Sequence, residues 1–340
     1  MPSQSRRAHV LPPSDNRKMS THLGEFDLIA RYFTRPAVRA VLGVGDDCAL
    51  LDVPQGQQLA VSTDMLVEGR HFMPGANPQD LGHKALAVNL SDLAAMGAEP
   101  LAFTLALALP KAEAAWLEAF SAGLLALADA HGIELVGGDT TKGPLNLCIT
   151  VMGLVPPRCA LRRDAAREGD SVWVSGTPGD ARLVLGGLRG EWRLAAEDLD
   201  VLRERLDRPL PRVALGLALR GVAHAAIDIS DGLLGDLAHV LHASRVGASI
   251  VVDDVPASAV MRTQPVERRR ICQLAGGDDY ELLFTAPADR HEAVLAAANA
   301  AHTPVARIGQ ITAAPGLVLR DVQGQAVAAH YAAFDHFRTP

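Results

Sequence analysis

Aspartates that recur in one local context constrain this chain more than any other sequence feature. Nearly every one follows or interrupts an apolar run and has glycine, serine or threonine close by. The segments are Gly45-Asp-Asp47, Ser62-Thr-Asp64, Asn89-Leu-Ser-Asp92, Gly137-Gly-Asp-Thr-Thr141, Asp228-Ile-Ser-Asp-Gly232 and Gly276-Gly-Asp-Asp-Tyr280. A single aspartate pair after glycine is most often an exposed turn. Because neighbouring carboxylates repel unless water or a cation lies between them, the repetition favours a cation site.

Length and composition limit the fold and the partners of the chain. With 340 residues it is long enough for two domains, each with its own core. The net charge of −7 and the aromatic content of 4% argue against a nucleic-acid partner. No apolar run approaches the roughly 18 residues of a membrane span. The four cysteines show no C-x-x-C spacing, so we expect reduced core thiols in a cytoplasmic protein.

The ends of the chain and a proline pair suggest the domain boundaries. Residues 1–21 are polar and basic and contain no apolar segment of a secretory signal. We expect them to form a disordered N-terminal extension, and Met19 is a candidate for the natural start. Pro156-Pro157 is the most plausible boundary between an N-terminal domain, residues 22–156, and a C-terminal domain, residues 157–340.

Apolar periodicity and turn residues predict alternating helices and strands over most of the chain. Helices are expected at 25–33, 78–96, 113–130, 196–205, 213–219, 233–243 and 290–300, and a turn at 177–179 leads into another. Strands are expected at 59–62, 101–109, 133–136, 145–154, 171–174, 225–229, 249–252, 280–285 and 305–311. This alternation favours an α/β or α+β layered fold.

The predicted helix 78–96 carries polar residues inside an otherwise apolar sequence. Asn89 and Asp92 are three residues apart and therefore share one face of the helix, with Ser91 next to them. Two interpretations stay open: this face is exposed to solvent, or it forms a polar notch aimed at a ligand.

Several common catalytic motifs are missing from the sequence. It contains no Walker A loop, no G-x-G-x-x-G, no H-E-x-x-H and no G-x-S-x-G. The scattered aspartates instead offer hard oxygen ligands, which select Mg²⁺, Mn²⁺ or Ca²⁺. Several such ions would let an acidic site bind phosphates that it would otherwise repel. The residues alone therefore indicate a metal-dependent enzyme that acts on phosphates.

The order of these motifs resembles the thiamine-monophosphate kinases. The matching segments are Gly24-Glu-Phe26, Gly45-Asp-Asp-Cys-Ala-Leu-Leu51, Ser62-Thr-Asp64, His71-Phe72, the stretch from Lys84 to Gly97, Gly137-Gly-Asp-Thr-Thr141, Asp228-Ile-Ser-Asp-Gly-Leu233, Gly276-Gly-Asp-Asp-Tyr-Glu-Leu282 and Phe334-Asp-His-Phe337. The individual aspartate motifs also occur in aminoimidazole-ribotide synthetases, selenophosphate synthetases and hydrogenase-maturation proteins. The resemblance runs from about Gly24 to Pro340 and implies phosphorylation of thiamine monophosphate to thiamine diphosphate, the last step in the biosynthesis of that cofactor.

The resemblance also implies roles for individual residues. The matches to Mg²⁺ ligands are Asp47, Ser62, Thr63, Asp64, Asp92, Asp139, Asp228 and Asp231. The matches to ATP contacts are Gly138, Asp139, Arg163 and Ser230, and those to contacts with thiamine monophosphate are His71, Asp278 and Phe334. Relatives often carry glutamate where this chain has Asp278, which keeps the charge and shortens the reach. No residue is expected to act as nucleophile or base, because an acceptor phosphate oxygen is already deprotonated and can attack the γ-phosphorus directly in line.

The implied architecture has two α/β domains of the aminoimidazole-ribotide-synthetase type. Strands of the N-terminal domain would join those of a second copy in the β-barrel of a homodimer, and ATP would lie between the domains. Two alternatives remain: a sister ATP-dependent synthetase, and a non-catalytic protein of the same fold that senses a metal or nucleotide.

Overall fold

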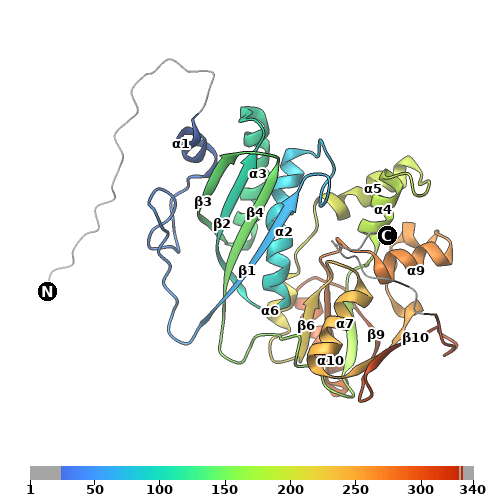
Figure 1. Cartoon of the computed structure of the whole chain (residues 1–340). Coiled ribbons are helices and arrows are strands. Elements are labelled where there is room, and N and C mark those ends of the chain that lie inside the picture. Colours follow the sequence, from blue (N-terminus) through green and yellow to red (C-terminus); the bar gives the residue numbers. More distant parts are fainter. Residues whose placement is uncertain (1–23, 329–330, 332–340) are drawn as a thin grey trace.

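The computed structural model describes residues 24–328 and residue 331. The predicted disordered extension, residues 1–21, and the predicted substrate contact Phe334 lie outside the described residues. Two mixed β-sheets with flanking helices form the described part of the chain (Figure 1). The predicted layered α/β fold is therefore confirmed.

The N-terminal half is built on a four-stranded sheet with the order β1-β4-β2-β3. Its strands are β1 (Gln58–Val67), β2 (Glu99–Leu109), β3 (Glu134–Lys142) and β4 (Asn146–Val155). β4 is antiparallel to both β1 and β2, whereas β2 and β3 are parallel. Before the sheet come a short helix α1 (Glu25–Leu28) and a π-helical turn η1 (Ile29–Phe33). The long helices α2 (Pro78–Ala95) and α3 (Ala114–His131) follow β1 and β2.

Helix α2 is buried on nearly all sides. Asn77 caps its start, because the side-chain oxygen accepts a 2.9 Å hydrogen bond from the Gln79 N–H. Its end is marked by Gly97, whose φ of +60° suits glycine. Helix α3 crosses α2 so closely that a Cβ atom on Gly123 would lie 1.8 Å from the Gln79 carbonyl oxygen. The helix is therefore held between the sheet, α3 and the second half of the molecule (Figure 1).

The C-terminal half contains a six-stranded sheet with the order β10-β7-β9-β5-β8-β6. Its strands are β5 (Ser171–Ser175), β6 (Ala225–Asp228), β7 (Gly247–Val251), β8 (Leu282–Ala286), β9 (Val305–Thr312) and β10 (Gly316–Arg320). The helices are α4 (Asp180–Leu188), α5 (Ala196–Asp207), α6 (Val213–Ala218), α7 (Leu233–Ser244), α8 (Ala259–Arg262), α9 (Val266–Ala275) and α10 (His291–Ala300), with the 3₁₀ turns η2 (Val252–Asp254) and η3 (Ala288–Arg290). One buried apolar cluster continues from Phe103 and Ile149 of the first sheet to Trp173 and Phe284 of the second.

Some elements differ from the sequence prediction. The predicted helix 25–33 is split, because its second half is the π-helical turn η1. The predicted strand 133–136 continues through Gly137 and Gly138 as β3, paired along β2. The predicted strand 280–285 begins only at Leu282, since Tyr280 has a φ of +51°. Helix α9 and strand β10 were not predicted. None of the helices in the described part of the chain is long and apolar enough to cross a membrane.

Candidate functional site

A cavity of about 700 Å³ between the two halves brings together seven of the predicted site residues. They are Asp64, His71, Asp92, Asp228, Ser230, Asp231 and Asp278. They come from β1, the loop after it, α2, the end of β6 and the loop before β8. Segments as far apart in sequence as Asp64 and Asp278 thus meet at one place, as the recurrent aspartates suggested.

Hydrogen bonds from neighbouring residues set the positions of these carboxylates. The Ser62 hydroxyl donates to Asp92, and the Ser91 hydroxyl donates to Asp228 Oδ2 over 2.8 Å. The backbone N–H of Asp64 donates to Asn89 Oδ1 over 3.1 Å. Asn89 and Ser91 are almost completely buried, so this face of α2 is not a solvent-exposed surface. It is a polar notch whose residues orient the aspartates at the wall of the cavity.

Burial, with mutual repulsion at two of the three residues, raises the carboxyl pKa values of this cluster. Burial, reinforced by Asp92 and Asp231, raises the pKa of Asp64 to about 6. Burial, together with the charge of Asp92, raises the pKa of Asp228 to about 8. The pKa of Asp92 is raised as well, by burial, although Ser62 and the charge of Arg163 oppose the shift. The three carboxyl groups resist being ionised at the same time. A multivalent cation beside them would lower their pKa values and favour the ionised form.

The donor set fits Mg²⁺ that is shared with a phosphate. Within residues 24–328 and 331, no three acidic, histidine or cysteine side chains lie close enough to hold one ion by themselves. Mg²⁺ commonly takes one or two carboxylates and completes its octahedron with water and substrate phosphate oxygens. The hard oxygens of Asp64, Asp92 and Asp228 therefore suit ions whose remaining ligands come with a nucleotide.

The turn after β6 presents Ser230 and Asp231 to the cavity. Asp236 on α7 accepts hydrogen bonds from the backbone N–H groups of Ser230, Asp231 and Gly232, at 3.1–3.2 Å. Burial, opposed by these hydrogen bonds, raises the pKa of Asp236 to about 7. Asp236 thus fixes the shape of the turn, a role that the sequence analysis missed.

A second cavity of about 460 Å³ places Arg163 near the same cluster. It is lined by Ser62, Asp92, Arg162, Arg163 and Asp164, so Asp92 faces both cavities. A positive charge beside the acidic cluster can bind phosphate oxygens of a ligand that also reaches the metals. The predicted role of Arg163 at the nucleotide phosphates stays a prediction.

Four predicted residues lie elsewhere in the single chain. Gly138 and Asp139 are on β3, at the opposite edge of the sheet from β1, and line a small pocket with Phe33 and Val44. Three strand spacings separate the two edges, about 14 Å. Asp47 is exposed in the loop before β1.

Thr63 also points away from the cavity. Successive side chains alternate between the faces of a strand, so Thr63 lies on the opposite face from Ser62 and Asp64. There its hydroxyl is 2.8 Å from that of Thr150 on the neighbouring strand β4. Any ligand of Thr63 would therefore have to reach the outer face of this sheet.

On the substrate side, His71 and Asp278 line both the large cavity and a smaller adjoining one. His71 Nδ1 accepts a 3.0 Å hydrogen bond from the Val67 N–H, which fixes the ring and its tautomer. Asp278 forms a 3.2 Å ion pair with the nearly buried Lys84 of α2. Sequence reasoning missed Lys84, although it begins the apolar stretch that ends at Gly97, because a lysine on a helix is usually solvent-exposed.

Comparisons with known proteins agree with this geometry. The family model for the N-terminal domain of AIR synthase related proteins matches residues 45–155 of this chain, and the model for their C-terminal domain matches residues 167–322. The thiamine-monophosphate kinase of Escherichia coli strain K12 is 48% identical over 324 residues, which cover 93% of this chain and 99% of the relative. The chain belongs to the thiamine-monophosphate kinase family.

Solved structures of thiamine-monophosphate kinases share the fold. The crystal structure of the kinase from Stenotrophomonas maltophilia K279a has a TM-score of 0.80 and 47% identity, covering 88% of this chain and 95% of that one. A structure of AaThiL complexed with AMPPCP and TMP has a TM-score of 0.73 and 29% identity, covering 95% and 100%. The hydrogenase maturation protein HypE has the same TM-score at 23% identity, and this likeness concerns the fold alone.

Proposed function

We propose that this chain uses Mg²⁺ to transfer the γ-phosphoryl group of ATP directly to thiamine monophosphate. As a thiamine-monophosphate kinase, it converts thiamine monophosphate to thiamine diphosphate with ATP. The observation that carries the mechanism is the group of Asp64, Asp92 and Asp228 around one cavity, with two raised carboxyl pKa values that call for bound cations. A relative complexed with AMPPCP and TMP supports the same pair of substrates.

Different residues of the chain would bind the metals, the phosphates and the nucleotide. Asp64, Asp92, Asp228 and Asp231 would hold Mg²⁺, which neutralises charge on the transferring group when bound. Arg163 would bind phosphate oxygens of ATP from the side of the second cavity. Ser230 would contact the nucleotide. In-line attack by a deprotonated phosphate oxygen needs no general base, so these residues act by orientation and electrostatics.

The acceptor would bind near His71 and Asp278. The adjoining pocket there is lined by apolar side chains, among them Phe72, Met73 and Leu188, together with charged ones of both signs, so it suits a flat heterocycle that carries charged groups. The carboxylate of Asp278 suits a cationic ring, and its ion-pair partner Lys84, which lines the same pocket, would attract an acceptor phosphate. Phe334 remains a proposed contact from beyond the described residues.

A homodimer would explain the residues that the single chain leaves apart. Leu59, Val61 and Met65 on β1 expose 41–58% of their surface on one side of the sheet, an apolar face that a second copy can cover. In a barrel with β1 of one copy beside β3 of the other, Gly138 and Asp139 would reach the partner's acidic cluster, with Asp47 and Thr63 near the same seam. The four cysteines are free thiols, but the expectation that they lie in the core holds only for Cys272, since Cys48 is exposed and Cys148 and Cys159 are half-buried. Free thiols suit a cytoplasmic protein, the location that we propose.

Substitution of a single carboxylate tests the metal-assisted mechanism. Purified protein with labelled ATP and thiamine monophosphate should form thiamine diphosphate, and ATP alone should leave no label on the protein. Asp64→Asn and Asp231→Asn should each remain folded but lose about two to four orders of magnitude in rate, since each removes a metal-binding charge. Activity within about threefold of the parent at saturating Mg²⁺ would remove these residues from the site. A different phosphorylated product would favour a sister synthetase.

A further inference from the structure

The loop that carries Asp278 has a backbone that other residues must hold in place. Asp278 and Tyr280 have φ values of +66° and +51°, in the left-handed region that residues with a side chain seldom adopt. Such conformations persist where the surroundings enforce them, and they gather at functional sites. The Asp278 carboxylate is the proposed contact of the acceptor, so the restraints on this loop determine where that contact lies.

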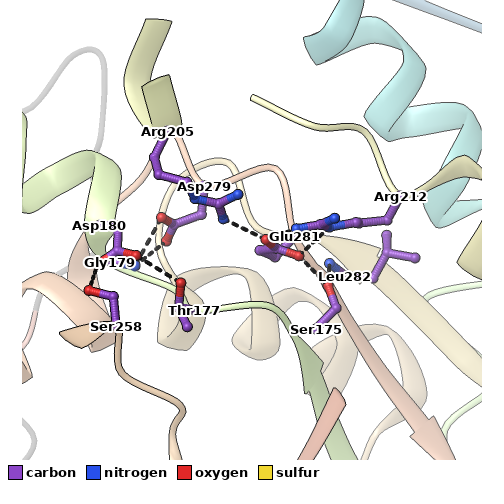
Figure 2. Close-up of polar contacts among 10 residues, drawn as sticks. All are labelled: Ser175, Thr177, Gly179, Asp180, Arg205, Arg212, Ser258, Asp279, Glu281 and Leu282. Atoms are coloured by element: carbon purple, nitrogen blue, oxygen red, sulfur yellow. Dashed lines mark hydrogen bonds and ion pairs between the residues drawn. The ribbon is translucent and has the colours of Figure 1, made fainter. Parts of the chain in front are cut away.

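Two buried carboxylates, Asp279 and Glu281, alternate with these residues, and both are bonded to residues of the second domain (Figure 2). Asp279 accepts hydrogen bonds from the Gly179 N–H with both oxygens, at 2.9 and 2.8 Å. Glu281, with no exposed surface, accepts from Arg205 over 2.6 Å, from Arg212 Nε over 2.6 Å, and from the Ser175 hydroxyl. Glu281 therefore joins β5, α5, the segment before α6 and the start of β8.

The Glu281 cluster is fully paired and ionised. Burial opposes its charge, but the hydrogen bonds and charges of Arg212 and Arg205 outweigh burial and lower the pKa of Glu281. The space around it is filled, because a Cβ atom on Gly176 would lie 2.1 Å from Glu281 Oε1. The same Ser175 hydroxyl also accepts from the Leu282 N–H over 2.9 Å. The first residues of β8 therefore have little freedom to shift.

The segment between the two arginine partners of Glu281 is itself docked on α2. His83 Nε2 lies 2.9 Å from the Pro209 carbonyl oxygen, and Asp80 forms a 3.1 Å ion pair with Arg208. Lys84, on the same side of α2, holds Asp278 from the cavity side. Helix α2 thus contacts the second domain both at the 208–212 segment and at Asp278. Glu281 links these two segments, because it is three residues after Asp278 and binds Arg212.

We infer that Glu281 is a positioning residue, which through Arg205 and Arg212 fixes the 276–281 loop so that Asp278 faces Lys84 in the acceptor pocket. It touches neither substrate. Its removal should weaken binding of thiamine monophosphate more than binding of ATP. Asp278 is the proposed acceptor contact on this loop, whereas Ser230, whose carbonyl oxygen accepts a 2.9 Å hydrogen bond from the Asp278 N–H, is one of several proposed contacts of ATP and its metals. The inference rests on the proposed role of Asp278 as an acceptor contact.

The test compares three single variants by steady-state kinetics with each substrate varied in turn. Asp278→Asn measures the acceptor contact itself. Glu281→Gln keeps the size and the Ser175 hydrogen bond and removes the charge that holds both arginines. Asp170→Asn is the matched control: Asp170 is also buried and paired, with His224 and Thr285, but it lies at the opposite ends of β5 and β8. It should lower stability without changing either KM.

For Glu281→Gln we expect a KM for thiamine monophosphate raised about tenfold, a KM for ATP within about twofold, and kcat within about fivefold of the parent. Equal changes in both KM values, or none, would overturn the inference, provided that Asp278→Asn raises the acceptor KM. No effect of Asp278→Asn would instead refute the proposed acceptor site.

A milder variant keeps the test decisive if Glu281→Gln does not fold. Arg205→Lys retains the positive charge and leaves Arg212 on Glu281, but it loses the planar fork. It should raise the acceptor KM about threefold and leave the ATP KM unchanged. In that case an unchanged acceptor KM would count against the inference.

Discussion

At the residue scale, the raised carboxyl pKa values predict how stability depends on pH and Mg²⁺. Asp64 and Asp228 have pKa values of about 6 and about 8 in the folded chain, against an unperturbed 3.8. The stability that they contribute is therefore complete below about pH 4 and is lost as the pH rises through 6 and 8. We expect the Tm of the metal-free protein to fall between about pH 5 and pH 9.

Mg²⁺ should reverse that loss, because it supplies the missing counter-charge. Differential scanning fluorimetry should show a larger Mg²⁺-induced rise in Tm near pH 9 than near pH 5. The Asp64→Asn variant should have a flatter pH profile and a smaller response to Mg²⁺. A response to Mg²⁺ that is equal at both pH values would contradict the assignment of these carboxylates to the metals.

Ser91 offers a second prediction at this scale. Its buried hydroxyl donates to Asp228 and lowers the pKa of that carboxyl, opposing the larger upward effect of burial. In Ser91→Ala, Mg²⁺ should displace the proton of the Asp228 carboxyl less readily. The Mg²⁺ concentration for half-maximal activity should therefore rise roughly tenfold. Ser121→Ala is the control, since Ser121 is also a buried helix serine but donates within α3. If both variants need the same Mg²⁺ concentration as the parent, Ser91 does not tune the site.

The sequence identified individual carboxylates better than the residues that orient them. Asp64, Asp92 and Asp228 stood out because a carboxylate beside apolar sequence needs a partner. Asp236 and Lys84 gave no such indication, since each lies on a helix where a charged residue is usually exposed. Their roles depend on contacts with segments far away in the sequence. Arg205 and Arg212 escaped notice for the same reason.

At the element scale, local sequence patterns predicted the long helices and strands. They failed where pairing with a neighbouring strand overrides the secondary-structure preference of the residues themselves. Helix α2 has a side-chain cap at Asn77 and helix α3 ends at a left-handed Gly132, and both were found nearly to the residue. β3 continues through two glycines because β2 lies alongside it, with a register shift near Phe103. The polar sequence of α9 is rich in arginine and is buried only near its end, at residues 272–274, so it lacked an apolar period strong enough to recognise.

The crossing of α2 and α3 yields a prediction about stability and activity together. Gly123→Ala would normally favour a helix, but here the new Cβ would meet the Gln79 carbonyl oxygen. We expect a loss of about 1–3 kcal/mol in the free energy of unfolding and lower activity, because α2 carries Asp92 and Lys84. Ala122→Gly, on the exposed side of α3, reports helix propensity alone and should cost about 1 kcal/mol with activity unchanged. A more stable Gly123→Ala protein would show that the helices can separate freely.

At the scale of the whole molecule, the single chain leaves one part of the proposed site incomplete. The cavity gathers Asp64, Asp92 and Asp228, whereas Asp139 lies on the far edge of the first sheet. No pattern within one sequence distinguishes residues that meet in one chain from those that meet across a dimer. The resemblance to the family places all four in one site, and the exposed apolar face of β1 indicates how a second copy would complete it.

Mixed dimers test this arrangement directly. Asp64→Asn and Asp139→Asn should each be inactive as homodimers, because every site lacks one ligand. If a site takes Asp64 from one copy and Asp139 from the other, a heterodimer of the two variants has one intact site and one site without either ligand. Random mixing makes half of the dimers mixed, so coexpression should restore roughly a quarter of the parent activity. Asp64→Asn coexpressed with Asp228→Asn is the control: both residues line the same cavity of one chain, so every site stays defective and no activity should return. Recovery in neither pair, with dimers verified by ultracentrifugation, would mean that each chain builds its own site and must move β3 toward the cavity when it binds ATP.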